Sequence, residues 1–537
     1  MRQTTLSVGL EVKPESHDHL CDLLDKLRPR SRSYPAGGDV SFDDLAKAVP
    51  VLHFMSLSVF PGFDYDPLFV IEANFDGEPG PFWAQLEACY GPELRTFLRC
   101  CKRPLDQDGP LFDAVTATDS RTPIAPYLQV RAERPTVFHH GNRGMSRDRI
   151  LAEFALFKGT RVALDAEDRA YRTLSPAGIH AKLREQLIGQ FQWLDQPAPR
   201  RIPFAEDLAD WLKLGAFIVT AILALSLPGL VLALAVTPGV YFLLVILGFV
   251  VLAAWLKRIA GPLPGTDTPK RFSLKGLLFG QLLPIAFFLA LYLAIVSAIA
   301  TPLSALLTGR SLALAWGDML VWLALGIASV PTTIAGILVW LRALERADSA
   351  QDAPPVDPEM LRGMARREDW IPQNHMGSIV LIKPGILRAI LIRVGHRGLG
   401  LLLRIVARDG YLGSMRTIHF AHWAMVNNKS RLMFFSNFDQ TWESYLDDFI
   451  EKAHEGLSLA WSCGVGFPPV RFLIYDGASH GGQFKEWARH SMAISRFWYS
   501  AYPDLTTDQI ERNYRVALGL RKATLSEEEA ALWIHDL

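Results

Sequence analysis

Three long stretches without a charged residue most constrain what this 537-residue chain can fold into. They cover residues 214–256, 276–309 and 319–341. A helix needs about 20 apolar residues to cross the hydrocarbon core of a bilayer. The first stretch is long enough for two crossings, with Thr237, Pro238 and Gly239 as the turn between them. The sequence therefore predicts four membrane spans, near 214–235, 240–256, 276–300 and 319–341.

The basic residues beside these spans predict their orientation. Lysines and arginines precede the first span, separate the second from the third and follow the fourth. The turn after the first span has no basic residue, and the loop after the third has only Arg310. Basic loops stay in the cytoplasm, and the N-terminus has no apolar signal segment. We therefore expect an integral protein of the inner or plasma membrane, with both termini and both soluble parts in the cytoplasm.

The charge balance and the cysteines argue against nucleic acid and a metal ion as binding partners. Lysine plus arginine and aspartate plus glutamate number 55 each, so the totals do not predict a basic face for nucleic acid. The five cysteines lack the paired spacing of a zinc site. We predict the lipid bilayer as a partner, and neither nucleic acid nor a metal ion.

A repeated pattern flanks the membrane region. His53 and Phe54 begin an alternating segment that leads to a second strand ending in Asn-Phe-Asp at 74–76. His419 and Phe420 begin the same pattern, which ends in Asn-Phe-Asp at 437–439. Each copy predicts a β-hairpin, and each hairpin is followed by apolar residues at helical spacing.

The segments around each hairpin extend the repeat to six elements. A strand and a helix are predicted upstream in both copies, at 4–10 and 17–27 and at 378–382 and 387–407. Further strands are expected downstream, at 127–130 and 470–475. Ser146 and Thr507 are the predicted N-caps of later helices. The order β-α-β-β-α-β is that of a ferredoxin-like unit.

The predicted fold is therefore α+β. Two ferredoxin-like (βαββαβ) repeats pack together, sheet on sheet, and a four-helix transmembrane segment interrupts them. The predicted regions are the first repeat (1–160), a connector with an amphipathic helix (161–213), the transmembrane region (214–341), a polar linker (342–375), and the second repeat with a C-terminal extension (376–537). The amphipathic stretch at 179–193 fits either the membrane interface or the soluble body.

Longer segments of both copies carry a resemblance to a known group. IHFAHW at 418–423, LMFFSNFDQTWESYLDDFI at 432–450 and SAYPDLTTDQI at 500–510 resemble a set of uncharacterised bacterial proteins with dimeric α+β-barrel domains. The first-half counterpart LFVIEANFDG at 68–77 supports the same grouping. The barrel superfamily includes dye-decolorizing peroxidases and chlorite dismutases, so the resemblance implies tandem ferredoxin-like units and a haem. The GxxDG loop of the dye-decolorizing peroxidases is absent from this sequence.

Four residues are candidates for chemistry, each with a structural alternative. His419 and His53 occupy the same place in the two repeats, and each is either a cofactor ligand or an imidazole bonded to nearby backbone. Asp439, at a strand end, is either an acid–base group or a capping residue. Arg143, before the helix capped by Ser146, either holds an anion or lies in a solvated loop.

Two functional hypotheses follow. The first is a peroxidase-like oxidoreductase with haem as its cofactor, acting on a hydrophobic small molecule at the membrane. The second is a non-catalytic, membrane-tethered protein that binds a ligand or serves as a scaffold. Transport is disfavoured because the spans contain no ionisable residue. The sequence leaves the oligomeric state open.

Overall fold

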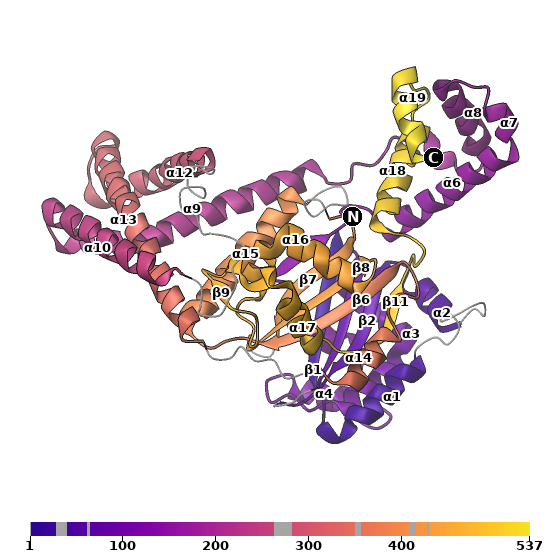
Figure 1. The fold of residues 1–537 in the computed structure, drawn as a ribbon, viewed down its shortest axis with the longest axis horizontal. Helices are drawn as coiled ribbons and strands as arrows, with labels where there is room; N and C mark the ends of the chain where they lie inside the picture. The colour runs from indigo at the N-terminus through magenta and orange to yellow at the C-terminus, as the bar shows by residue number, and fades with distance from the viewer. Residues whose placement is uncertain are drawn as a thin grey trace.

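The computed structural model describes residues 2–27, 40–61, 65–261, 282–348, 356–407, 415–426 and 429–537. Within these ranges the chain is a mixed α+β structure (Figure 1). Two β-sheets lie at its centre, four long helices extend away from them on one side, and a group of shorter helices stands at the opposite end.

The first sheet has five strands in the order β11-β2-β3-β1-β4, and all neighbours are antiparallel. Its strands are β1 (Gln3–Glu11), β2 (Leu52–Phe60), β3 (Leu68–Asp76), β4 (Ala132–Glu133) and β11 (Ser495–Ser500). Its core contains residues of the helices α1 (His17–Leu27), α2 (Val40–Ala48), α3 (Pro79–Cys100), α4 (Gly109–Thr116) and α5 (Ala125–Arg131).

The second sheet has four strands in the order β5-β7-β8-β6, again antiparallel. Its strands are β5 (Val137–His140), β6 (Gln373–Leu381), β7 (Ile418–Val426) and β8 (Arg431–Asp439). The helices in its core are α14 (Pro358–Ala365), α15 (Ile386–Val406), α16 (Trp442–Trp461) and α17 (Gly481–Ser491).

The two halves of the chain exchange one strand each. β5 follows the first half along the chain but pairs with β7, so that His139 lies opposite Ala421. β11 follows the second half but pairs with β2, so that Tyr499 lies opposite Met55. Each sheet is therefore completed at one edge by a strand from the other half.

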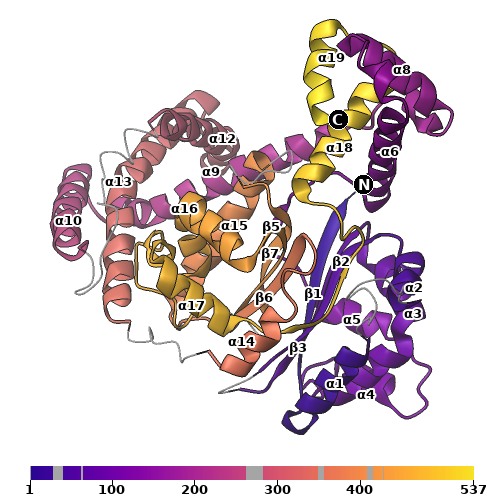
Figure 2. The same cartoon turned by 45° about the vertical axis from the view of Figure 1, so that its right-hand side comes forward.

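The faces of the two sheets meet in a shared apolar cluster. Every residue of β2, β3, β7 and β8 is buried, because helices cover one face of each sheet and the opposite sheet covers the other. Phe60 and Val70 of the first sheet pack with Val426, Met433 and Phe435 of the second. This contact joins both sheets into one body, which Figure 2 shows from the side.

Four helices are long and apolar enough to cross a membrane, as the sequence predicted. They are α9 (Phe204–Ala235), α10 (Pro238–Ile259), α12 (Leu282–Thr308) and α13 (Leu312–Arg346). α9 and α13 extend beyond the predicted spans at the ends nearest the body. The first residues of the predicted third span, 276–281, lie outside the described residues.

A separate group of helices stands beside the strand ends. It comprises α6 (Arg147–Ala166), α7 (Asp168–Tyr171), α8 (Pro176–Ile188), α18 (Thr507–Arg521) and α19 (Glu527–Trp533). Leu156, Leu183, Val516 and Trp533 share its apolar core. The amphipathic stretch at 179–193 therefore packs within this group, through α8.

Several sequence predictions are wrong in detail. Residues 127–130 belong to helix α5, which has a proline in its first turn. The strand predicted at 470–475 is two short strands, β9 (Val470–Arg471) and β10 (Tyr475–Asp476), because Phe472 and Leu473 adopt positive φ and turn the chain. The polar linker at 342–375 contains the end of α13, helix α14 and the start of β6. Thr506 caps α18 in place of Thr507.

Candidate functional site

Two histidine–carboxylate pairs occupy equivalent places in the two sheets. Nε2 of His53, on β2, lies 3.1 Å from Oδ2 of Asp76 at the end of β3. Nε2 of His419, on β7, lies 2.8 Å from Oδ1 of Asp439 at the end of β8. All four side chains are buried. The repeat seen in the sequence is thus a repeat of buried polar pairs.

Each carboxylate also accepts a hydrogen bond from the start of a helix. The backbone N–H of Arg147, the first residue of α6, donates to Asp76 over 2.8 Å. The backbone N–H of Thr507, the first residue of α18, donates to Asp439 over 2.7 Å. A helix start has unpaired N–H groups and a partial positive charge. A carboxylate accepts hydrogen bonds from these N–H groups and stabilises the charge. Capping was the structural alternative for Asp439, and both aspartates accept from the start of a helix distant in sequence.

Tyr502 lies between the two pairs. Its ring centroid is 5.8 Å from that of His53 and 5.9 Å from that of His419. Burial and the nearby carboxylates of Asp76 and Asp439 hold the pKa of Tyr502 well above 10.0, so the phenol stays protonated. Its hydroxyl can donate to Nδ1 of His53, 2.9 Å away. Nε2 of His53 lies close to Asp76 but has no hydrogen-bond partner among the described residues, whereas Nε2 of His419 is hydrogen-bonded to Asp439.

This geometry does not fit a haem ligated by either histidine. The Nε2 atom of each imidazole lies against a carboxylate oxygen. Nδ1 of His419 has no hydrogen-bond partner among the described residues, but the rings of Phe54 and Tyr502 lie 5.3 and 5.9 Å from the His419 ring. A haem needs open space beside the ligating nitrogen, and neither histidine lines the large cavity described below. We therefore derive no step through haem.

Arg143 lies elsewhere, at the junction between the body and the first span. Nη2 of Arg143 lies 2.6 Å from Glu206 and 2.7 Å from Asp210, both on α9. Nη1 of Arg143 donates to the backbone carbonyl of Arg404, on α15, over 2.6 Å. Among the described residues, no hydrogen bond or ion pair joins Arg143 to His53, His419 or Asp439. The structure therefore does not unite the four sequence candidates in one site.

A cavity of about 590 Å³ opens beside Arg143. Residues of β1, β5, α9 and α15 line it, and some are apolar, including Leu6, Phe138 and Leu401. Seven lysines and arginines line it against three acidic residues, Glu78, Glu206 and Asp210. The basic residues are Arg2, Arg134, Arg143, Arg201, Lys213, Arg397 and Arg404.

Some of these cations are already paired, and three are not. Arg404, like Arg143, bonds Glu206 and Asp210, while Arg201 bonds Glu511. Arg134, Lys213 and Arg397 have no hydrogen-bonding or ionic partner among the described residues. Burial and the neighbouring Arg404 guanidinium hold the pKa of His140, which also lines the cavity, well below 6.5. The cavity thus has unpaired positive charge that suits an anion.

A second polar group lies between the sheets and was missed in the sequence. Glu72 of β3 is fully buried, and burial raises its pKa to about 8 despite hydrogen bonds from Asn74 and Ser56. Nε2 of His375 lies 3.9 Å from Glu72. Burial lowers the pKa of His375 and of His422 to about 3. A charged residue inside the apolar strand LFVIEANFD was the available signal.

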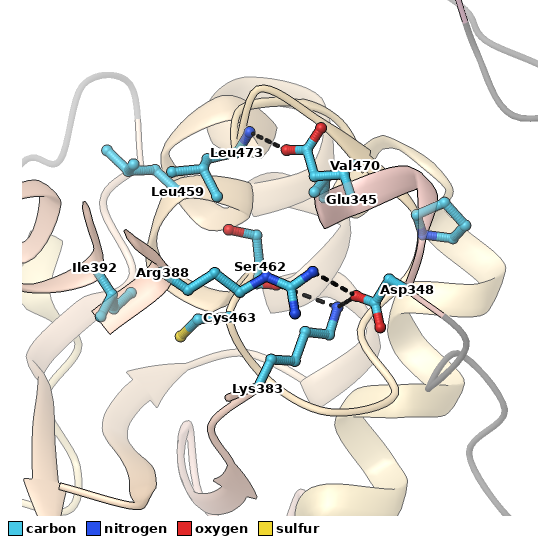
Figure 3. Close-up of a pocket in the computed structure, with 11 residues that line it drawn as sticks. Glu345, Asp348, Lys383, Arg388, Ile392, Leu459, Ser462, Cys463, Val470 and Leu473 are labelled. Carbon is cyan, nitrogen blue, oxygen red and sulfur yellow. Dashed lines mark hydrogen bonds and ion pairs between the residues drawn. The ribbon is translucent and has the colours of Figure 1, made fainter. Parts of the chain in front are cut away.

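The small cavity in Figure 3 marks where the fourth span meets the body. It encloses about 20 Å³, roughly the room for one water molecule. Nζ of Lys383 lies 2.7 Å from Asp348, and Oε1 of Glu345 accepts from the backbone N–H of Leu473 over 3.0 Å. These polar groups are mutually satisfied, so the site fastens α13 to the body and offers little to a ligand.

Comparisons with known proteins found no matching family model, no similar curated protein and no similar solved structure. The resemblance to tandem α+β-barrel proteins therefore stays a prediction from the sequence.

Proposed function

We propose that this chain is a membrane-anchored protein whose α+β body binds a small anionic ligand in the basic cavity beside the first span. In this proposal the halves are ferredoxin-like repeats, the body and both termini are cytoplasmic, and the membrane is the inner or plasma membrane. The observation that carries the proposal is the charge of Arg134, Lys213 and Arg397, whose side chains have no partner in the described part of the chain, in a cavity of about 590 Å³.

The lining favours a ligand with both an acidic and an apolar part. The cations can bond a carboxylate or phosphate, and the two guanidinium groups suit bidentate bonds. Leu6, Phe138 and Leu401 offer apolar contact to the rest of the molecule. Such an amphiphile agrees with the hydrophobic small molecule expected from the sequence, and binding it requires no cofactor.

The first hypothesis from the sequence, a haem-dependent peroxidase-like enzyme with His419 and His53 as ligands, is not part of this proposal, which develops the second. The carboxylate contacts of both histidines support a structural role for them. Asp439 and Arg143 likewise have structural partners, a helix start and the junction with α9.

The test is a calorimetric titration of the detergent-purified chain with dodecyl phosphate, beside inorganic phosphate and the uncharged detergent dodecyl maltoside. We expect the double variant Arg134→Gln/Arg397→Gln to weaken dodecyl phosphate binding about tenfold or more, because each charge-assisted hydrogen bond contributes about 1.5–3 kcal/mol.

The matched control is Arg121→Gln/Arg169→Gln, which removes two exposed arginines outside the cavity. This control should bind like the parent chain. Equal binding by the cavity variant and the parent, or no binding by the parent, would overturn the proposal.

A further inference from the structure

α15 has a stripe of exposed apolar residues, here called its outer face, that winds slowly around the helix. Ile386, Ile390, Val394, Leu402 and Val406 recur at intervals of four or eight residues, with 78%, 51%, 45%, 46% and 60% of their surfaces exposed. The inner face of the same helix packs into the core of the second sheet through Ile392, Leu399 and Leu403. A body helix that is apolar on both faces needs a second apolar environment.

α15 crosses the body-side ends of two membrane spans. Near its middle, Gly398 lies against Phe217 at the start of the first span, where an added Cβ would stand 3.1 Å from the ring. Toward its C-terminus, Arg404 bonds Asp210 of α9. Near its N-terminus, Arg388 donates to the backbone carbonyl of Leu344, close to the end of α13.

This position lies at the body-side ends of two helices that could cross a membrane. A span enters the hydrocarbon at its terminal residues, and a helix that bridges two such ends lies along the membrane surface. Figures 1 and 2 both show α15 between the sheets and α9. The exposed apolar residues flank Gly398, the point where α9 crosses, on both sides. Exposed apolar residues of α15 thus lie on both sides of its contact with the first span.

The start of α9 continues the same surface. Phe204, Leu208 and Trp211 are 64%, 46% and 53% exposed, and their spacing places them on one side of the helix before the first span. Tryptophan is enriched at the membrane interface, where its amphipathic ring fits the headgroup level.

Charge supports the same assignment. Arg393 and Arg397 of α15 are exposed, and neither has an ionic partner among the described residues. Basic side chains beside an apolar helix face are typical of helices that lie in the interface, because they attract acidic headgroups.

We propose that α15 is an interfacial helix that inserts its outer face into the leaflet on the side of the body, and that the partner is a bilayer containing acidic lipid. The four spans tether the chain, while α15 holds the body flat against this leaflet. This inference rests on exposure and placement, and it stands independently of any ligand in the cavity.

The experiment places a bimane fluorophore on α15 of the full chain in vesicles. Val394→Cys and Leu402→Cys are each labelled in a Cys89→Ser background, since the other four cysteines are buried. The vesicles hold phosphatidylcholine and phosphatidylglycerol at about seven to three, with or without bromine on the acyl chains. Leu532→Cys is the matched control, an exposed leucine on α19 in the helical group.

We expect brominated lipid to quench the labels at 394 and 402 several-fold more than the label at 532. Quenching at 394 and 402 no greater than at 532 would overturn the inference. A label could also be shielded from water without being quenched by bromine. If that shielding fell on dilution, a second copy of the chain would cover the outer face of α15, and the inference would be overturned. The variant Arg134→Gln, which removes a cavity cation and leaves Arg393 and Arg397 in place, separates the two proposals, because it should weaken dodecyl phosphate binding and keep the quenching.

Discussion

The two halves of the body share one set of buried contacts and differ in the helix that follows the first strand. Both halves join a histidine, an aspartate and a helix start: His53, Asp76 and α6 in one, and His419, Asp439 and α18 in the other. The helix differs, because α1 covers 11 residues and packs on its own sheet, whereas α15 covers 21 and reaches two membrane spans.

This difference separates contacts that both halves need for folding from features that are present in one half and could serve a function. The contact that recurs has the same structural role in both halves. It joins the strand ends to a helix, α6 in one half and α18 in the other. The features without a counterpart are α15, the basic cavity beside it and the junctions with the spans. A ligand or membrane function therefore belongs to the second set.

The largest expected effect tests whether the shared contacts are structural. Asp439→Ala leaves a buried imidazole and a helix start unpaired, and we expect a loss of about 3–5 kcal/mol of stability. Asp76→Ala should cost a similar amount, because Asp76 has the same two kinds of partner. Thermal unfolding of the detergent-purified chain measures both. If one substitution destabilised the chain and the other were silent, the equivalence of the halves would be wrong.

An intermediate effect concerns Glu72, a buried acidic residue in the first sheet. The equivalent position in the second sheet holds Phe435, which is uncharged. The folded chain keeps the Glu72 proton up to about pH 8, whereas an unfolded chain loses it near 4.5. The native state then binds more protons, so the contribution of Glu72 to stability falls by about 2 kcal/mol as pH rises from 6.5 to 8. Buried histidines with lowered pKa values, including His375, His422 and His139, oppose this trend while their unfolded imidazoles, with a pKa of 6.5, still lose protons. The contribution of Glu72 is therefore the difference between a variant and the parent chain.

Glu72→Gln removes this titration. We expect the variant to lose less melting temperature than the parent between pH 6.5 and 8, as measured in paired unfolding scans at each pH. Glu185→Gln, at an exposed position, is the control and should follow the parent. Parallel pH profiles for Glu72→Gln and the parent would show that Glu72 is already ionised at neutral pH.

The smallest expected effect sharpens the comparison at the helix starts. Ser146 caps α6 by accepting from the N–H of Arg149, and Thr506 caps α18 by accepting from the N–H of Gln509. We expect Ser146→Ala and Thr506→Ala each to cost about 1 kcal/mol, a loss that denaturant titration can measure. A much larger loss of stability in one variant would mean that the two caps do not contribute equally to the stability of the chain.

Much of the architecture could be predicted because it depends on local pattern. The helix at 17–27 and the hairpin strands follow from periodicity within each segment, and the N-cap at Ser146 follows from a residue type at a helix start. The candidate site was harder to predict. His53, His419 and Asp439 stood out because they recur, but Tyr502, the partner of His53, and the start of α18, the partner of Asp439, lie far away in the sequence.

The four helices that could cross a membrane were predictable from the sequence alone, because the free energy of moving an uncharged apolar stretch into lipid is a sum over its own residues. The tertiary structure decided the rest. It exchanged β5 and β11 between the sheets and enclosed Glu72 where burial raises its pKa. It also gathered cations from α9, α15 and the segments beside β1, β5 and α9 around one cavity. Burial and charge pairing depend on which segments meet in space, and no local pattern contains that information.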